Sequence, residues 1–139
     1  MKKLLQFGAG NIGRSFTAQL FSAAGYEVVF ADVDEKLIAA LNEKRFYTVS
    51  VRDKECYNIE VKNVRAIKST DTEAVKSEMF DADICATAVG PFVLPKLFDV
   101  IAKGLIARKS RPLDIILCEN LRDAASIVRK GLKELLPAD

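Results

Sequence analysis

Near the start of this chain, a glycine triplet stands between a strand pattern and a helix pattern. The apolar run Lys3–Phe7 predicts a short buried strand, and Gly8-Ala9-Gly10-Asn11-Ile12-Gly13 follows it directly. Apolar residues then recur at helical spacing, at Ile12, Phe16, Leu20 and Phe21. In this context Gly8 permits a tight turn, Gly10 lets a phosphate approach the backbone, and Gly13 allows close helix packing. The segment therefore predicts a phosphate-binding turn at a helix N-terminus.

A carboxylate, Asp32, stands nineteen residues after Gly13, at the end of the next predicted strand, 27–31. An acid in this place accepts hydrogen bonds from the adenine ribose of a dinucleotide. It would repel a 2′-phosphate, and Val33, Asp34 and Glu35 follow it where NADP enzymes usually place a basic residue. These residues predict a site that prefers NAD(H), with Asp32 and Val33 among its contacts.

The rest of the chain alternates strand patterns with helix patterns, which is typical of parallel βαβ units. Gly25 predicts the end of the first helix, and Asp34 predicts the N-cap of the second. Further on, the patterns predict helix 72–80, strand 83–88, helix 92–107 loosened near Gly104, buried strand 114–118 and helix 121–136. We therefore expect one α/β domain over residues 1–139, a doubly wound, mainly parallel Rossmann sheet with its cofactor-binding part in residues 1 to about 120.

Between two of these units, the segment 46–68 changes to strict alternation of apolar and polar residues. Around a polar turn at 52–54, Tyr47, Val49 and Val51 are expected to oppose Tyr57, Ile59 and Val61. This pattern predicts an inserted β-hairpin.

Two later strand ends are candidate contributors to the site, because ligands of open α/β sheets lie outside the carboxyl ends of the strands. In the first, the small residues of Thr87-Ala88-Val89-Gly90-Pro91 would let the backbone approach the nicotinamide side, with Ala88, Val89 and Gly90 as contacts. An ordinary strand-to-helix turn explains this segment equally well. In the second, Cys118-Glu119-Asn120, the polar pair Glu119-Asn120 can donate and accept near the reacting carbon, or Asn120 simply caps the last helix.

Composition excludes several classes of function. The chain has no histidine, which excludes Ser-His and Cys-His chemistry and argues against a catalytic metal within this chain. Its three cysteines have no zinc-site spacing and are expected to be reduced thiols of a cytoplasmic protein. The net charge is only +2, without long runs of like charge, so neither a nucleic-acid nor a membrane partner is expected.

The whole chain resembles the N-terminal part of the mannitol-1-phosphate 5-dehydrogenases, which belong to the polyol-specific long-chain dehydrogenases. Four segments carry the resemblance: Phe7-Gly8-Ala9-Gly10-Asn11-Ile12-Gly13-Arg14, Phe30-Ala31-Asp32-Val33, Thr87-Ala88-Val89-Gly90-Pro91 and Cys118-Glu119-Asn120. Ser15 departs from the glycine expected after Arg14.

The resemblance implies metal-free, NAD-dependent interconversion of mannitol 1-phosphate and fructose 6-phosphate. It implies that Gly8 through Arg14 contact the cofactor and that Asn120 helps to hold the substrate oxygen, as the one catalytic contribution of this chain. The family's catalytic lysine, asparagine and histidine belong to a helical C-terminal domain, which we expect to lie outside this chain. The chain by itself is expected to bind NAD without turning it over.

Two alternatives remain open at this point. A non-catalytic NAD-sensing regulatory domain, as in potassium channels and redox repressors, is similar over the first forty residues but lacks the hairpin and the Cys118-Glu119-Asn120 strand end. The cofactor domain of another polyol or uronate dehydrogenase would differ only in substrate. The sequence does not indicate the oligomeric state.

Overall fold

A computed structural model describes residues 1–109 and 111–137, and a parallel sheet of five strands organises them. The order across the sheet is β5-β2-β1-β6-β7, and every neighbouring pair is parallel. The strands are β1 (Lys3–Phe7), β2 (Glu27–Asp32), β5 (Val64–Lys68), β6 (Ile84–Thr87) and β7 (Asp114–Leu117). The chain builds outward from β1 to β2 and β5, then returns to the other side of β1 for β6 and β7. The predicted doubly wound Rossmann-type fold is therefore confirmed.

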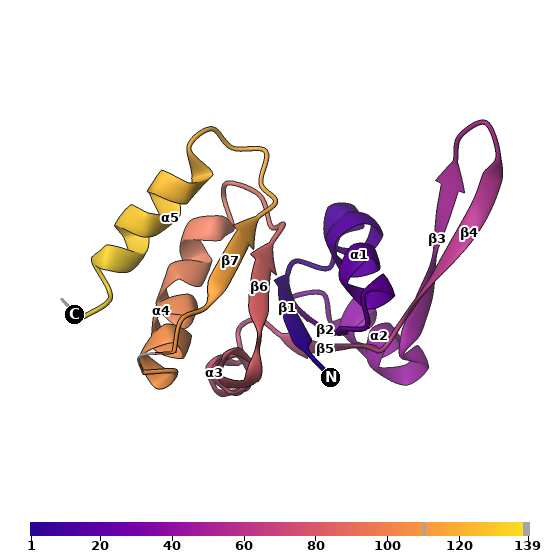
Figure 1. Cartoon of the computed structure of the whole chain (residues 1–139). Coiled ribbons are helices and arrows are strands. Elements are labelled where there is room, and N and C mark those ends of the chain that lie inside the picture. The colour runs from indigo at the N-terminus through magenta and orange to yellow at the C-terminus, as the bar shows by residue number, and fades with distance from the viewer. Residues whose placement is uncertain (110, 138–139) are drawn as a thin grey trace.

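Helices connect the strands on both faces of this sheet (Figure 1). In chain order they are the π-helical turn η1 (Gly13–Thr17), α1 (Ala18–Ala23), α2 (Glu35–Lys44), α3 (Thr72–Asp81), the 3₁₀ turn η2 (Leu94–Leu97), α4 (Phe98–Ala107) and α5 (Ala124–Lys133). None of the helices in the described part of the chain combines the length and the apolar composition needed to cross a bilayer.

The two faces of the sheet carry separate cores, because successive side chains of a strand point to opposite sides. On one face Leu5 and Phe7 of β1 pack with apolar residues of α3, α4 and α5. On the other face Leu4 packs with α1, α2 and β4. In Figure 1 the first set of helices lies to the left of β1 and the second to the right. Because Val128 and Leu132 of α5 belong to the first core, the packed unit extends past residue 120.

The predicted hairpin is present, in the predicted register. It consists of β3 (Phe46–Arg52) and β4 (Cys56–Lys62), with Tyr47 opposite Val61 and Val49 opposite Ile59. Figure 1 shows that the hairpin projects from the body of the domain. Its end was predicted wrongly, however, since Val64–Lys68 is not part of it. That segment is β5, which pairs with β2 in the main sheet, because Asn63 adopts a positive φ of 58° and redirects the chain.

Two further expectations were wrong in detail. Helix α4 is continuous at Gly104; the irregular part is its beginning, where η2 precedes it. A Cβ at Gly104 would lie 2.2 Å from the sulfur of Met79, so this glycine allows α3 and α4 to pack closely. Strand β7 is not fully buried, because it is the edge strand and Asp114 and Ile116 are exposed.

Among the residues that the structure describes, the charged side chain of Arg108 is buried, with only 6% of the residue exposed. Its guanidinium donates to carbonyl oxygens at the end of α3, including those of Met79 at 2.6 Å and Ala82 at 2.8 Å, and to Pro112 at 2.8 Å. Cations are favoured at helix C-termini, where carbonyls lack intrahelical partners. Arg108 therefore ties α3 to the segment that leads into β7.

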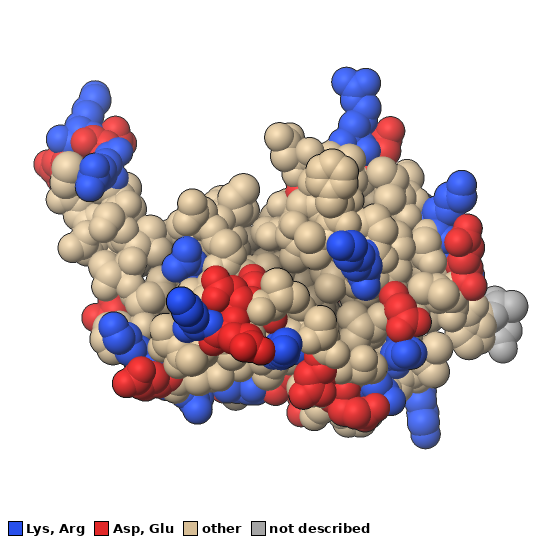
Figure 2. Space-filling view, turned by 180° about the vertical axis from the view of Figure 1, so that it is seen from behind, with Lys and Arg blue, Asp and Glu red and all other residues tan. Residues whose placement is uncertain are grey.

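Charged side chains of both signs are interspersed on the face shown in Figure 2, along the lower margin and at the tip of the hairpin. A part-buried cluster of ion pairs joins β1 and β5 to α3. In it, Glu78 of α3 accepts from Lys3 of β1 at 2.9 Å and from Arg65 of β5 at 2.6 Å. These ion pairs lie at the sheet edge opposite the carboxyl ends of the strands, where α/β proteins bind ligands.

The thiol of Cys85 on β6 is fully buried, and desolvation raises its pKa to about 12, although the Arg108 guanidinium opposes this shift. Because the folded state keeps this thiol neutral to a higher pH than the unfolded state does, the stability that it contributes is fully present below the unfolded pKa of about 8.5 and is lost as the pH rises toward 12. Because the thiolate is the nucleophile, we expect iodoacetamide at pH 8 to modify exposed Cys56 while Cys85 reacts only after unfolding. Peptide mass spectrometry with and without urea measures this; equal labelling rates in the native chain would contradict it.

Candidate functional site

The glycine turn leaves β1 in a conformation that its glycines make possible. Gly8 has a φ of +96°, and a Cβ there would lie 2.3 Å from the carbonyl oxygen of Ala88. A Cβ at Gly13 would lie 2.2 Å from the carbonyl oxygen of Gly8, so the helix packs directly on the turn. At Gly10, by contrast, a Cβ would meet no atom within 4 Å, and this side of the backbone is open. Each glycine thus has the steric setting that its sequence position predicted.

The helix that follows begins irregularly. Arg14 N donates to Gly10 O at 3.0 Å, and the next turn is the wide π-helical turn η1, in which the Ser15 hydroxyl donates to the carbonyl oxygen of Asn11. The first turn of a helix leaves amides without intrahelical partners, and here that turn is the segment 10–13. Beside it, Arg14 Nη2 contacts Asn11 Oδ1 at 3.5 Å, and Arg14 Nε is buried with no hydrogen-bond partner among the described residues. Hydrogen-bond donors therefore gather at this turn.

The hairpin supports the same helix from outside. The Tyr47 hydroxyl donates to the carbonyl oxygen of Arg14 at 2.6 Å, and its ring lies 6.1 Å from that of Phe30 on β2. Burial raises the pKa of Tyr47 well above its usual value, with Arg14 opposing the shift, so the hydroxyl remains a donor at neutral pH.

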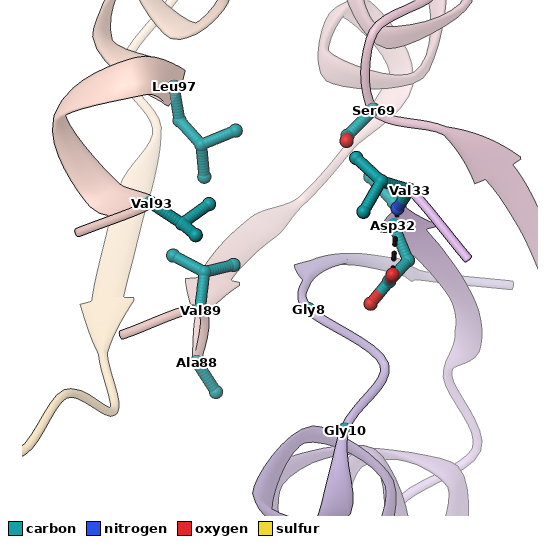
Figure 3. Close-up of a pocket in the computed structure, with 10 residues that line it drawn as sticks. Gly8, Gly10, Asp32, Val33, Ser69, Ala88, Val89, Val93 and Leu97 are labelled. Atoms are coloured by element: carbon teal, nitrogen blue, oxygen red, sulfur yellow. Dashed lines mark hydrogen bonds between the residues drawn. The ribbon is translucent and has the colours of Figure 1, made fainter. Parts of the chain in front are cut away.

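Asp32 ends β2 with its carboxylate directed at the glycine turn (Figure 3). Its Oδ2 accepts from Ala9 N at 2.7 Å, and its Oδ1 accepts from Val33 N at 2.7 Å and from Asp34 N at 3.0 Å. Three backbone donors therefore fix the carboxylate, and since a carboxylate offers about four lone pairs, an acceptor position remains. Asp34 caps α2, as predicted, by accepting from Lys36 N and Leu37 N.

Asp32 and Val33 form one wall beside the turn, and the segment after β6 forms a second wall across from it. Its Ala88 N donates to Phe7 O at 2.9 Å, which extends the pairing of β6 with β1. Val89 N and Gly90 N both donate to the carboxylate of Glu119, each at 2.8 Å. The sequence placed Glu119 at this strand end as one of a polar pair near the reacting carbon, whereas its carboxylate is taken up by these two loop amides. The signal available was an acid just after a strand, beside a loop with two consecutive amides.

Asn120 follows Glu119 and is exposed. The N-cap of α5 is Asp123, so the expectation that Asn120 caps this helix is wrong; residues 121–123 separate it from the helix. Asn120 is also absent from the lining of the cleft. Cys118, just before this pair, has its sulfur 3.5 Å from the Thr17 hydroxyl, which links the end of β7 to η1.

The turn and the two walls enclose a cleft of about 290 Å³ where the strand order reverses. Figure 3 shows Asp32, Val33 and Ser69 on one side and Val89, Val93 and Leu97 on the other, with Gly8 between them. Six predicted contacts line it: Gly8, Gly10, Asp32, Val33, Ala88 and Val89. The other predicted residues lie outside the lining: Ala9, Asn11, Ile12, Gly13, Arg14, Gly90 and Asn120. Residues that the sequence did not indicate complete the lining: Ala31, Ser69, Val93 and Leu97.

The parallel order β5-β2-β1-β6-β7 and a glycine turn at its reversal point define the class of Rossmann-type α/β domains. Within that class the chain belongs to the mannitol dehydrogenase Rossmann domain family, whose model matches residues 2–139.

Curated relatives support this assignment. The chain is 45% identical over 135 residues to a mannitol-1-phosphate 5-dehydrogenase of Halalkalibacterium halodurans, covering 96% of this chain and 36% of the relative. It is 47% identical over 133 residues to the enzyme of that name from Shouchella clausii, covering 94% of this chain and 35% of the relative. The chain therefore spans little more than a third of these relatives.

Among solved structures, octopine dehydrogenase in a complex described as containing NADH and L-arginine matches with a TM-score of 0.69 and 20% identity. The match covers 99% of this chain and 32% of that one. At this identity the likeness supports the fold.

Proposed function

We propose that this chain binds NAD(H) as the cofactor domain of an NAD-dependent oxidoreductase, a mannitol-1-phosphate 5-dehydrogenase. The observation that carries the proposal is the hydrogen bond of 2.7 Å from Ala9 N to Asp32, which joins the proposed ribose acceptor to the proposed phosphate-binding turn. The names of the curated relatives point to the reaction, in which mannitol 1-phosphate and NAD are interconverted with fructose 6-phosphate and NADH.

The residues present fit a dinucleotide. Gly10 is open where a pyrophosphate would approach, and the first-turn amides at 10–13 with the Arg14 guanidinium would hold its charge. Asp32 would accept from the ribose hydroxyls beside Val33 and Ser69. The nicotinamide half, which supplies hydride exchange when bound, would lie against the apolar wall of Val89, Val93 and Leu97 near Gly90.

Charge near Asp32 supports a preference for NAD(H) over NADP(H). A 2′-phosphate would meet this carboxylate. The nearest basic strand residue in register with it is Lys68, whose Nζ pairs with Glu35 Oε1 at 2.8 Å. This pairing lowers the pKa of Glu35 and raises that of Lys68, so both groups remain charged and offset one another.

Catalysis is proposed to need a further helical domain, with Asn120 contributing to the hold on the substrate oxygen. Exposed apolar residues support such a neighbour: Ile12, Phe16 and Leu20 recur along η1 and α1, and each is more than half exposed. Their spacing predicted the helix, but the core side of that helix is formed instead by Thr17 and Ala18.

The three free cysteines suit the reducing cytoplasm, which we propose as the site of action.

The rival interpretation as an NAD-sensing regulatory domain is disfavoured by two features that such domains lack. The inserted hairpin is present, and the strand end Cys118-Glu119-Asn120 is tied to the cleft wall through Glu119. Another polyol or uronate dehydrogenase remains the alternative for the substrate, which a domain beyond these residues would select.

Titration of the chain with NADH, followed by the fluorescence of the reduced nicotinamide, tests the proposal. We expect saturable binding with a dissociation constant of about 10–100 μM, below the millimolar range, because fixed donors and an acceptor already stand in place. No turnover of mannitol 1-phosphate is expected from the chain alone. Absence of binding at millimolar NADH would overturn the proposal.

A further inference from the structure

Glu119 makes a two-point contact beside the cleft, and the proposed function gives this side chain no part in binding the cofactor. Its two carboxylate oxygens take one amide each, from Val89 and Gly90, at 2.8 Å. We propose that Glu119 is a positioning residue, which holds the loop after β6 (residues 88–90, the β6 loop) so that Val89 forms the nicotinamide side of the cleft. The inference rests on the proposed function, because it assigns that wall to the nicotinamide half of the cofactor.

The geometry of the chain explains why a side chain is needed there. The pairing of β6 with β7 continues one step past the strands, where Cys118 N donates to Thr87 O at 2.8 Å. Beyond that point the β6 loop turns away, with a positive φ of 91° at Gly90, and its amides point toward the end of β7. Two consecutive amides that converge on one place match a carboxylate, which offers one oxygen to each.

The contact fixes the wall before any ligand arrives. Val89 lines the cleft, whereas Glu119 stands behind it and does not. Ala88, whose carbonyl oxygen faces Gly8, is held separately by its own bond to Phe7 O at 2.9 Å, so Glu119 acts on Val89 and Gly90 and not on the glycine turn. A wall held in its bound conformation reduces the ordering that binding requires, and that raises affinity.

The test is the substitution Glu119→Gln with two ligands, NADH and ADP-ribose, which lacks the nicotinamide. A glutamine side chain keeps one acceptor oxygen and replaces the other with an NH₂ donor, so one of the two bonds is lost and the remaining one is no longer charge-assisted. We expect NADH affinity to fall about tenfold, the lower end for a bond of this kind. ADP-ribose affinity should change by less than about twofold, since Asp32 and the glycine turn are untouched.

A matched control is Asp114→Asn, which removes a carboxylate at the N-terminal end of β7, away from the cleft, and should leave both affinities unchanged. If Glu119 only stabilises the fold, Glu119→Gln should lose affinity for NADH and ADP-ribose equally. That outcome would overturn the inference, and so would an unchanged affinity for NADH. Failure of the unsubstituted chain to bind either ligand would instead overturn the proposed function. Equal affinity of the unsubstituted chain for both ligands would overturn the assignment of this wall to the nicotinamide.

If Glu119→Gln does not fold, amide hydrogen exchange of the unsubstituted chain, followed residue by residue by NMR, replaces it. The amides of Val89 and Gly90 should exchange at least about tenfold more slowly than unstructured amides, because the carboxylate holds both. Exchange of both at the unstructured rate would contradict the inference.

Discussion

Replacing Gly13 by alanine is expected to lower the free energy of unfolding by about 2–3 kcal/mol and to abolish measurable NADH binding. The added Cβ would lie 2.2 Å from the carbonyl oxygen of Gly8. Because that neighbour is backbone, the conflict can be relieved only by moving the helix away from the turn. Urea unfolding followed by circular dichroism measures the loss of stability, and NADH fluorescence measures binding.

Gly10→Ala is the matched control for this prediction. Its Cβ would meet no atom within 4 Å, so the variant should unfold at nearly the same urea concentration as the unsubstituted chain. Its methyl group would nevertheless stand on the open side of the turn, and NADH affinity should fall at least about tenfold if the pyrophosphate approaches there. A Gly13→Ala chain as stable as the Gly10→Ala chain would contradict the steric role of Gly13.

The glycine turn and the hairpin could be predicted because both depend on residues close together in the sequence. Gly8 and Gly13 constrain their own segment, and the alternation from Tyr47 to Val61 determines which side chains share a face. The separation of β5 from the hairpin was missed for a related reason. Both segments alternate, and only the positive φ of Asn63, a single residue, divides them.

Ala88 and Val89 of the second wall were predicted from their strand end, but the residues that hold and complete the cleft could not be predicted in the same way. Glu119 and Val89 are thirty residues apart and meet only because β6 and β7 are neighbours in the sheet. Ser69 and Leu97 reach the cleft from the ends of β5 and η2, and neither position has a local pattern that indicates a ligand. Local periodicity likewise indicated a helix after Gly13 without showing that Phe16 would remain exposed.

The two walls of the cleft differ in how far apart in the sequence their residues lie. Apart from Ser69, the wall that would contact the adenosine half is encoded within the first βαβ unit, since Asp32 reaches the turn of the preceding strand through Ala9. The wall that would contact the nicotinamide half is assembled from three later segments, around Val89, Leu97 and Glu119. Substitutions in the first wall should therefore affect every adenine dinucleotide, whereas those in the second should depend on the nicotinamide half.

Asp32→Ala tests the first wall and is expected to reduce NADH affinity about tenfold or more, because a charge-assisted hydrogen bond contributes about 1.5–3 kcal/mol. The same change should shift the ratio of NADPH to NADH dissociation constants by about two to three decades toward NADPH. Two unit charges about 4 Å apart repel by roughly 4 kcal/mol at an effective dielectric of 20, and the substitution removes that repulsion. Parallel fluorescence titrations with NADH and NADPH measure both effects.

Asp32→Asn separates the charge from the hydrogen bonds. With its one acceptor oxygen in the place of Asp32 Oδ2, the asparagine can still accept from Ala9 N, so the turn keeps its support from β2, while the charge that would repel a 2′-phosphate is gone. The NADPH to NADH ratio should therefore shift in Asp32→Asn nearly as far as in Asp32→Ala, with a smaller loss of NADH affinity. Asp53→Ala, at the turn of the exposed hairpin, controls for a change of net charge remote from the cleft. An unchanged ratio in both Asp32 variants would show that this carboxylate does not select the cofactor, and the preference for NAD(H) would then need another source within the cleft.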